Sequence, residues 1–238
     1  IDQIIAAADI QRNELILEVG PGAGALTGRL VDLGCELTLI ESDRDLIPKL
    51  SATFPKAMLI QADAAGIDYD AIVRDRPWVF VSNLPYNAGN AILETVLQSK
   101  NLPNRLVVMV QKEVGERMMA KPGDMSVLSV AIQLSCDVEP ICVVGPEAFS
   151  PPPNVDSIVL RLISRRTTHD ARCAESIISL AKIGFSHRRK QLRQTLVQAK
   201  VADLAAIDSA FEAIGVLQTV RPQELSIAQW RRLREIFS

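Results

Sequence analysis

The chain has 238 residues and a formal net charge of −2, with 48% hydrophobic and 23% charged residues, which is the composition of an ordinary globular protein with room for one large domain and a small second one. No apolar stretch reaches the roughly 18 uncharged residues of a membrane-spanning helix and no basic and apolar leader precedes a cleavage site, so we expect a cytoplasmic protein that does not bind membranes. The four cysteines form no Cys-x-x-Cys pair, so we expect reduced core thiols, no disulfide framework and no bound metal.

The first half of the chain alternates short apolar runs with amphipathic segments after an opening helical pattern over residues 1–8. Strands are predicted at Leu15–Val19, Glu36–Glu41, Ala57–Gln61, Trp78–Ser82 and Arg105–Gln111. Helices are predicted at Ala25–Leu33, Asp45–Ala52 and Ala88–Gln98. A strand, a glycine-rich loop, a helix and a second strand make the unit from which parallel sheets are built, so we expect a doubly wound α/β sheet.

In the second half of the chain the strand pattern gives way to a helical pattern. Residues 127–141 predict a helix that leads to a strand, residues 157–163 predict a final strand, and strand signals end after about Ser164. The remainder predicts short amphipathic helices with breaks near Gly184, Gly215 and Pro222. We therefore expect an α/β domain at residues 1–164 and a small all-helical domain at residues 165–238.

A glycine-rich loop follows the first predicted strand and contains Gly20, Gly22 and Gly24. Glycines here let the backbone turn tightly and approach a ligand, although a plain tight turn is the alternative, because the spacing is not the GxGxxG of dinucleotide sites. Glu18 before the loop and Glu41 at the end of the second strand favour a ligand, since an acid at Glu41 can bind both hydroxyls of a ribose. Asp63 can accept a hydrogen bond from an adenine amino group, or instead cap a helix.

Asn83-Leu84-Pro85-Tyr86 follows the fourth predicted strand, where α/β sheets bind ligands. The segment supplies an amide, a carbonyl fixed ahead of a proline and an aromatic face, which are the groups needed to bind adenine. The exocyclic amine of adenine is a poor nucleophile because its lone pair is delocalised into the ring. If the Asn83 side-chain oxygen and the Leu84 carbonyl accept its two hydrogens, the nitrogen is drawn toward a tetrahedral geometry. Tyr86 can hold the ring by stacking, a contact worth about 1–3 kcal/mol per base.

Five motifs in order along nearly the whole chain resemble the small-subunit ribosomal RNA adenine N6,N6-dimethyltransferase family, and together they are specific although each alone is not. They are Glu18–Thr27 (EVGPGAGALT), Asn83–Asn87 (NLPYN), Gln111–Val114 with Glu116-Arg117, Phe149–Ser157 (FSPPPNVDS) and Arg188–Lys190 (RRK).

The resemblance implies a Rossmann-like class I methyltransferase sheet followed by a helical RNA-binding domain. It implies that S-adenosyl-L-methionine is the cofactor and that the substrate is two adjacent adenines near the 3′ end of small-subunit ribosomal RNA, methylated on an assembling ribosomal subunit. Cofactor contacts are expected from Glu18, Gly20, Gly22, Gly24, Glu41, Asp63 and Asn83. The catalytic residues are expected to be Asn83, Leu84, Pro85, Tyr86 and Phe149. Phe149 would stack on the target adenine opposite Tyr86, whereas without the resemblance it would be a buried loop anchor. We expect a monomer.

The chain departs from the family pattern at three places. A Gln-Asn-Phe-Leu-like segment that closes over the methionine end of the cofactor is not found before Ile1, so we expect the chain as written to bind cofactor poorly. After Pro122-Gly123 the usual extra residues and Tyr-Gly pair are missing. Asn154 replaces the usual Lys before Val155-Asp156, which removes one possible phosphate contact.

Positive charge is concentrated late in the chain. Between Arg161 and Lys200 there are ten Lys or Arg residues against two acidic residues. Within this stretch Arg188, Arg189, Lys190 and Arg193 are expected to bind RNA phosphates, with a solvated helix face as the alternative. Arg189 and Arg193 lie four residues apart and would share one helical face.

Three other functions share parts of this pattern. The related antibiotic-resistance dimethylases of large-subunit RNA are disfavoured by the Pro-rich run that ends at Ser157 and by the Arg188–Lys190 cluster. DNA adenine methylases typically carry a Pro-Pro-Tyr core and a larger target-recognition region. Mitochondrial transcription factors of the same fold are non-catalytic binding proteins, and the intact Glu41, Asp63 and Asn83–Tyr86 argue against lost catalysis.

Overall fold

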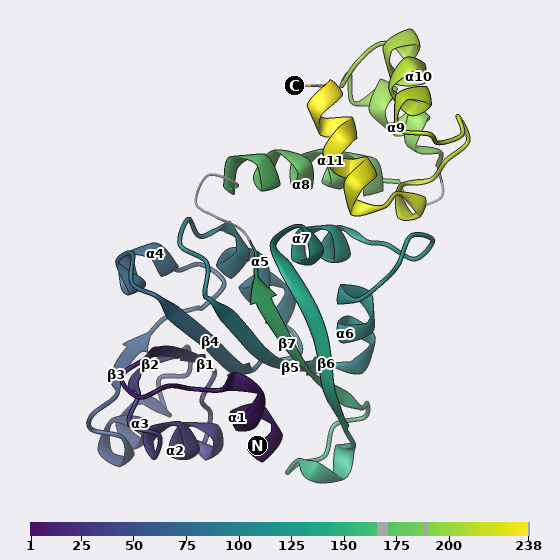
Figure 1. Ribbon diagram of the computed structural model, residues 1–238. Helices are drawn as coiled ribbons and strands as arrows, with labels where there is room; N and C mark the ends of the chain where they lie inside the picture. Colours follow the sequence, from purple (N-terminus) through teal and green to yellow (C-terminus); the bar gives the residue numbers. More distant parts are fainter. Residues whose placement is uncertain (166–170, 188–189, 238) are drawn as a thin grey trace. The chain divides into compact units, whose positions relative to one another are not determined.

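The computed structural model describes residues 1–165, 171–187 and 190–237, and it separates into two compact units (Figure 1). Over the described residues, unit 1 consists of residues 1–115 and 136–165. Unit 2 consists of residues 116–135, 171–187 and 190–237.

Unit 1 is built on a seven-stranded sheet with the order β3-β2-β1-β4-β5-β7-β6. Its strands are β1 (Leu15–Val19), β2 (Glu36–Glu41), β3 (Met58–Gln61), β4 (Trp78–Asn83), β5 (Arg105–Gln111), β6 (Cys136–Val144) and β7 (Ser157–Ser164). The first five strands pair in parallel, β7 runs antiparallel to β5, and β6 runs antiparallel to β7. The doubly wound sheet confirms the predicted α/β fold class.

Helices cover both faces of this sheet, so its central strands β1 and β4 are mostly apolar and are buried along almost their whole length (Figure 1). The helices are α1 (Asp2–Ala8), α2 (Ala25–Val31), α3 (Ile47–Thr53), α4 (Tyr69–Val73) and α5 (Gly89–Gln98). Ile4 of α1 and Leu30 of α2 share one buried cluster with Val79 of β4. On the other face, the Tyr69 ring of α4 stacks on Trp78, with the ring centroids 6.0 Å apart.

Two short helices were not predicted. The helix α4 has five residues and is capped at its start by Asp68, whose side chain accepts the N–H of Ala71. So short a segment shows no amphipathic period. The helix α6 (Lys112–Met118) contains Gly115, which weakens a helical pattern. Packing requires this glycine, because a Cβ there would lie 2.3 Å from Cγ2 of Ile158 on β7.

The regular secondary structure of unit 2 is all helical over its described residues, as predicted for the end of the chain. Its helices are α7 (Val127–Ser135), α8 (Ala171–Phe185), α9 (Leu192–Gln198), α10 (Leu204–Ala213), the 3₁₀ turn η3 (Pro222–Glu224) and α11 (Ile227–Ile236). The division differs from the predicted boundary after residue 164, because α7 belongs to unit 2. Val130 and Leu134 of α7 are buried in one cluster with Phe211 and Trp230, a packing partnership that an insertion between two strands does not reveal in sequence.

The predicted break near Gly184 coincides with the end of α8, which continues through the glycine to Phe185. A Cβ at Gly184 would lie 2.8 Å from the side chains of Leu192 and Trp230, so the glycine allows close packing. Gly215 does end a helix, with a φ of 69° just after α10.

The short connection after Gly123 is closed by backbone hydrogen bonds. The N–H groups of Gly123 and Met125 both donate to the carbonyl of Gln223, at 2.8 and 3.3 Å. Met125 is buried in the unit 2 cluster. The shortened segment therefore folds into the core of the unit. Among the described residues, no helix has the length and apolar character required to cross a membrane.

Candidate active site

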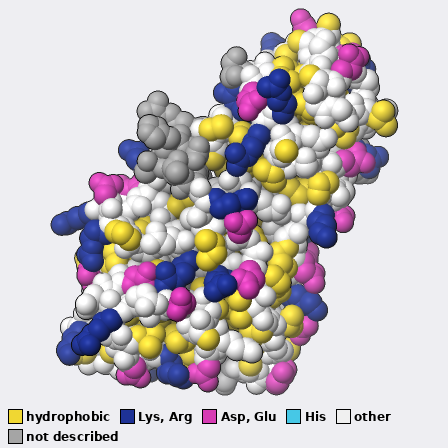
Figure 2. Space-filling model, viewed as in Figure 1, with side chains coloured by type: hydrophobic (Ala, Val, Ile, Leu, Met, Phe, Trp, Pro, Cys, Tyr) yellow, Lys and Arg dark blue, Asp and Glu magenta, His cyan; other side chains and the backbone are white. Residues whose placement is uncertain are grey.

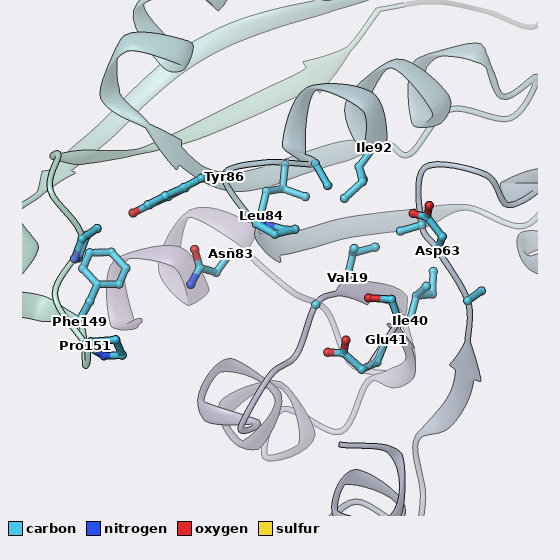
Figure 3. A pocket seen from close by; sticks show the side chains of 17 residues that line it. Val19, Ile40, Glu41, Asp63, Asn83, Leu84, Tyr86, Ile92, Phe149 and Pro151 are labelled. Atoms are coloured by element: carbon cyan, nitrogen blue, oxygen red, sulfur yellow. The ribbon is translucent and has the colours of Figure 1, made fainter. Parts of the chain in front are cut away.

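A cavity of about 400 Å³ lies at the carboxyl ends of β1, β2 and β4 (Figure 3). Strand order reverses between β1 and β4, and α/β sheets bind ligands at such a switch point. Eight predicted site residues line this cavity: Gly20, Glu41, Asp63, Asn83, Leu84, Pro85, Tyr86 and Phe149. The fold thus brings together five segments that are far apart in the sequence.

The glycine-rich loop forms one wall. Gly20 has a φ of 65°, and a Cβ there would lie 3.7 Å from Cδ of Pro85, so the loop passes close to the Asn83–Tyr86 segment. Its N–H donates to the Ile40 carbonyl at 2.9 Å, which ties the loop to β2. Gly24, with a φ of 86°, leaves room for the Phe54 ring. Neither Gly22 nor Gly24 is among the lining residues, so their contact with a cofactor stays a prediction.

Glu41 is buried and its carboxylate is fixed by backbone donors. Oε1 accepts the N–H of Asp43 at 2.9 Å, and Oε2 accepts the N–H of Gly22 at 3.3 Å. A preorganised carboxylate of this kind suits the two vicinal hydroxyls of a ribose. Asp63, by contrast, is exposed and accepts the N–H of Ala65 at 3.0 Å. Asp63 does not cap α4, because Asp68 does.

Glu18 lies under the loop and does not line the cavity. Its side chain is 1% exposed, and this burial raises the pKa of its carboxyl to about 7, with only partial relief from Thr27 nearby. Among the described residues, Glu18 Oε2 has no hydrogen-bond partner. The contact of Glu18 with the cofactor therefore stays a prediction.

The Asn83–Tyr86 segment is held by hydrogen bonds on both sides. Ser82 donates its hydroxyl to the Val19 carbonyl at 2.6 Å, which joins the ends of β4 and β1. The Leu84 N–H donates to the Met109 carbonyl on β5 at 3.1 Å. The Pro85 carbonyl accepts the N–H of Gly89 at 2.8 Å as α5 begins. The segment is therefore rigid where it meets the cavity.

Two aromatic rings lie on one side of the Asn83 amide, and the acids Glu41 and Asp63 lie on the other (Figure 3). Tyr86 is 38% exposed, and its hydroxyl lies 2.7 Å from the hydroxyl of Ser157. Phe149 follows the 3₁₀ turn η1 (Pro146–Ala148) and packs partly against the core while it lines the cavity. Phe149 is thus both a loop anchor and a cavity residue.

Several lining residues were missed by the sequence prediction. They are Val19, Ile40, Ser42, Ala62, Ala64, Ala88, Ile92, Pro151 and Pro153. Ile40 and Ala62 could have been predicted, because they lie at the ends of predicted strands whose neighbouring residues were assigned to the site. Ile92 carries no such signal, because only the path of α5 over the cavity turns this side chain inward (Figure 3).

The predicted phosphate-binding residues lie in unit 2, and Arg188 and Arg189 fall outside the described residues. Lys190 is exposed, and its ammonium donates to Oε1 of Gln198 at 3.3 Å. Arg193 forms a two-pronged ion pair with Asp208, with Nε 2.6 Å from Oδ1. Its contact with RNA therefore stays a prediction. On the face that Figure 2 shows, basic and acidic side chains are interspersed.

No group of three or more metal-ligating side chains occurs within the part of the chain that the structure describes. The cysteines Cys35, Cys136, Cys142 and Cys173 are free thiols. Cys136 is buried, but Cys173 is exposed, so the expectation of core thiols was wrong for Cys173.

The strand order, the glycine loop and the cavity at the switch point define a class I, Rossmann-like methyltransferase. The chain belongs to the ribosomal RNA adenine dimethylase family, whose model matches residues 1–238. Family membership confirms the predicted resemblance, the methyltransferase activity on ribosomal RNA adenine and the cofactor S-adenosylmethionine.

Similar proteins cover the whole chain. Ribosomal RNA small subunit methyltransferase A of Pseudomonas syringae pv. syringae is 39% identical, with 100% of this chain and 89% of the relative aligned. The protein of the same name from Picosynechococcus is 34% identical over 99% of this chain and 91% of the relative. A dimethyladenosine transferase from Plasmodium falciparum shares the fold, with a TM-score of 0.80 at 24% identity over 98% of this chain and 92% of that one.

Proposed function

We propose that the chain dimethylates the N6 amines of two adjacent adenines near the 3′ end of small-subunit ribosomal RNA, in the cytoplasm and during ribosome assembly. The observation that carries this proposal is the shared cavity, in which Asn83 lies between two aromatic rings and the acids of a nucleoside-binding wall. Relatives at 34–39% identity that are named small subunit methyltransferases support the choice of substrate.

Glu41 and Asp63 form the cofactor side of the site. Glu41 would bind the ribose hydroxyls of S-adenosylmethionine, because its carboxylate is already oriented by Gly22 and Asp43. Asp63 would accept from the adenine amino group, with the apolar Ile92 against the ring. The cofactor supplies an electrophilic methyl group on a sulfonium sulfur.

Asn83 and Leu84 activate the acceptor. The Asn83 side-chain oxygen and the Leu84 carbonyl would accept the two hydrogens of the target amine, which localises the nitrogen lone pair for direct displacement at the methyl. Pro85 fixes the backbone beyond the Leu84 carbonyl, and Tyr86 and Phe149 would hold the base between their rings. The amine becomes acidic on methylation and loses its proton to solvent, so no strong base is required, and a second cycle completes each adenine.

Unit 2 would orient the RNA. Its cations, including Lys190 and the sequence neighbours Arg188 and Arg189, would neutralise phosphates of the small subunit, and the enzyme would act as a monomer.

Substrate choice is tested with labelled S-adenosylmethionine and three acceptors in parallel: undermethylated small subunits, large subunits and DNA. Mapping by mass spectrometry should place N6,N6-dimethyladenine at two adjacent positions near the 3′ end of small-subunit RNA. Label confined to large subunits or to DNA would contradict the proposal.

A further inference from the structure

The two aromatic rings of the site come from different loops. Tyr86 lies between β4 and α5, and Phe149 lies in the connection between β6 and β7. That connection leaves the sheet at Val144 and returns at Ser157, and these two residues are register partners. The hydroxyls of Tyr86 and Ser157 lie 2.7 Å apart, so a hydrogen bond ties the Tyr86 ring to the base of the loop that carries Phe149.

Ser157 is a rigid anchor. It is the first residue of β7 and pairs with Gln111 of β5 on one side and Val144 of β6 on the other. Its side chain is fully buried, and Tyr86 is the one partner of its hydroxyl among the described residues. Either hydroxyl can donate. Because a buried hydroxyl cannot turn to water, Ser157 holds Tyr86 more firmly than solvent would.

Tyr86 needs such an anchor because it is only partly covered. More than a third of the residue is exposed, and an exposed aromatic side chain exchanges rotamers freely. The plane of the Tyr86 ring sets the plane of a base stacked on it, and that plane sets the direction of the amine relative to Asn83. We infer that Ser157 is a positioning residue. It holds Tyr86 at a fixed orientation opposite Phe149, so that a planar base binds between the two rings in a single orientation.

The inference rests on the proposed function, because it assumes that a base stacks on Tyr86. It goes beyond that function by assigning a role to a buried serine that does not line the cavity. A purely structural bond would affect folding stability and leave turnover alone, whereas a positioning bond affects the chemical step more than binding.

A double-mutant cycle with Ser157→Ala, Tyr86→Phe and the combined variant tests the inference. Tyr86→Phe keeps the ring and removes the bond. Each single variant should lower kcat about 10- to 100-fold, the loss expected for a displacement near 1 Å, with KM for the subunit and Kd for S-adenosylmethionine within about twofold. The double variant should be no slower than either single one, because both remove the same interaction.

Ser135→Ala is the matched control. Ser135 is also fully buried, and its hydroxyl has no partner among the described residues. This control should keep the wild-type kcat. A second readout uses RNA with the fluorescent base 2-aminopurine at the target position. Stacking against the aromatic rings should quench its fluorescence in the wild type, and the fluorescence should partly recover in Ser157→Ala.

Three results would overturn the inference: an unchanged kcat in Tyr86→Phe, losses that multiply in the double variant, or equal kcat values for Ser157→Ala and Ser135→Ala. If Ser157→Ala does not fold, Tyr86→Phe decides alone. Whether the proposed substrate is correct is tested separately, by the choice of acceptor of the wild-type enzyme. If wild-type enzyme methylates another nucleic acid instead, the cycle is measured on that acceptor and the inference stands or falls there.

Discussion

Gly22 donates its backbone N–H to Oε2 of Glu41 at 3.3 Å, across 19 residues of sequence. This bond joins the glycine loop to the end of β2, and Asp43 holds the other carboxylate oxygen. The carboxylate of Glu41 is thus oriented by the chain itself, and we expect it to be already in place for the ribose hydroxyls of the cofactor.

Glu41→Ala should weaken S-adenosylmethionine binding by roughly 1.5–3 kcal/mol, the range for hydrogen bonds to a charged group. Titration calorimetry measures the change. Glu36→Ala, at the other end of β2 and ion-paired with Arg76, is the control and should leave the affinity unchanged. Equal affinities for Glu41→Ala and the wild type would remove Glu41 from the site.

Glu18 should make stability depend on pH. Its pKa is raised from 4.5 to about 7 in the folded protein, so folding favours the protonated carboxyl. The contribution of the protonated carboxyl to the free energy of unfolding is fully present below pH 4.5 and is lost as the pH rises through 7. Relative to Glu18→Gln, the wild type should lose up to about 3 kcal/mol of unfolding free energy over this interval. Urea titrations from pH 4.5 to pH 8 measure it, with exposed Glu212→Gln as control. A pH-independent difference between wild type and Glu18→Gln would contradict the raised pKa.

Gly24→Ala should destabilise the protein more than Gly22→Ala. Both glycines have positive φ, which costs a non-glycine residue about 1–2 kcal/mol. Only at Gly24 does an added Cβ also meet a side chain, 2.5 Å from Cε2 of Phe54. That clash should add about 1–3 kcal/mol. Adding Phe54→Leu to Gly24→Ala should remove this extra destabilisation. If the effects of the two substitutions on the free energy of unfolding are simply additive, the Phe54 ring does not cause the clash.

The sequence predicted the strands of unit 1 closely because most of their apolar runs end at glycine or polar residues, as β1 does at Gly20. It also predicted that Asn83 and Glu41 share a site, since both end parallel strands of one sheet. It could not predict that α7 packs in unit 2, nor that Ser157 bonds to Tyr86, because neither contact leaves a local pattern. Arg193 shows the same limit: its basic run gave no sign of the ion pair with Asp208.

Replacing Arg188, Arg189 and Lys190 together with Gln tests the basic cluster. If each cation neutralises one phosphate, the salt dependence of RNA binding should flatten by up to about 0.9 log units per log unit of salt per contact, using the duplex coefficient as a guide. Cofactor affinity should not change. Gln at the exposed Lys49, Lys56 and Lys100 of unit 1 removes the same charge as a control. Identical salt slopes for the two triple variants would place the RNA contacts elsewhere.

The central claim is that Asn83 orients the target amine for transfer. The direct measurement is the single-turnover rate of methyl transfer to undermethylated small subunits by Asn83→Ala, with RNA affinity measured on the same preparation. The account predicts that transfer is abolished while affinity stays within a few-fold, and that Asn90→Ala, an exposed neighbour on α5, matches the wild type. Transfer at the wild-type rate, or a parallel loss of RNA binding, would contradict it.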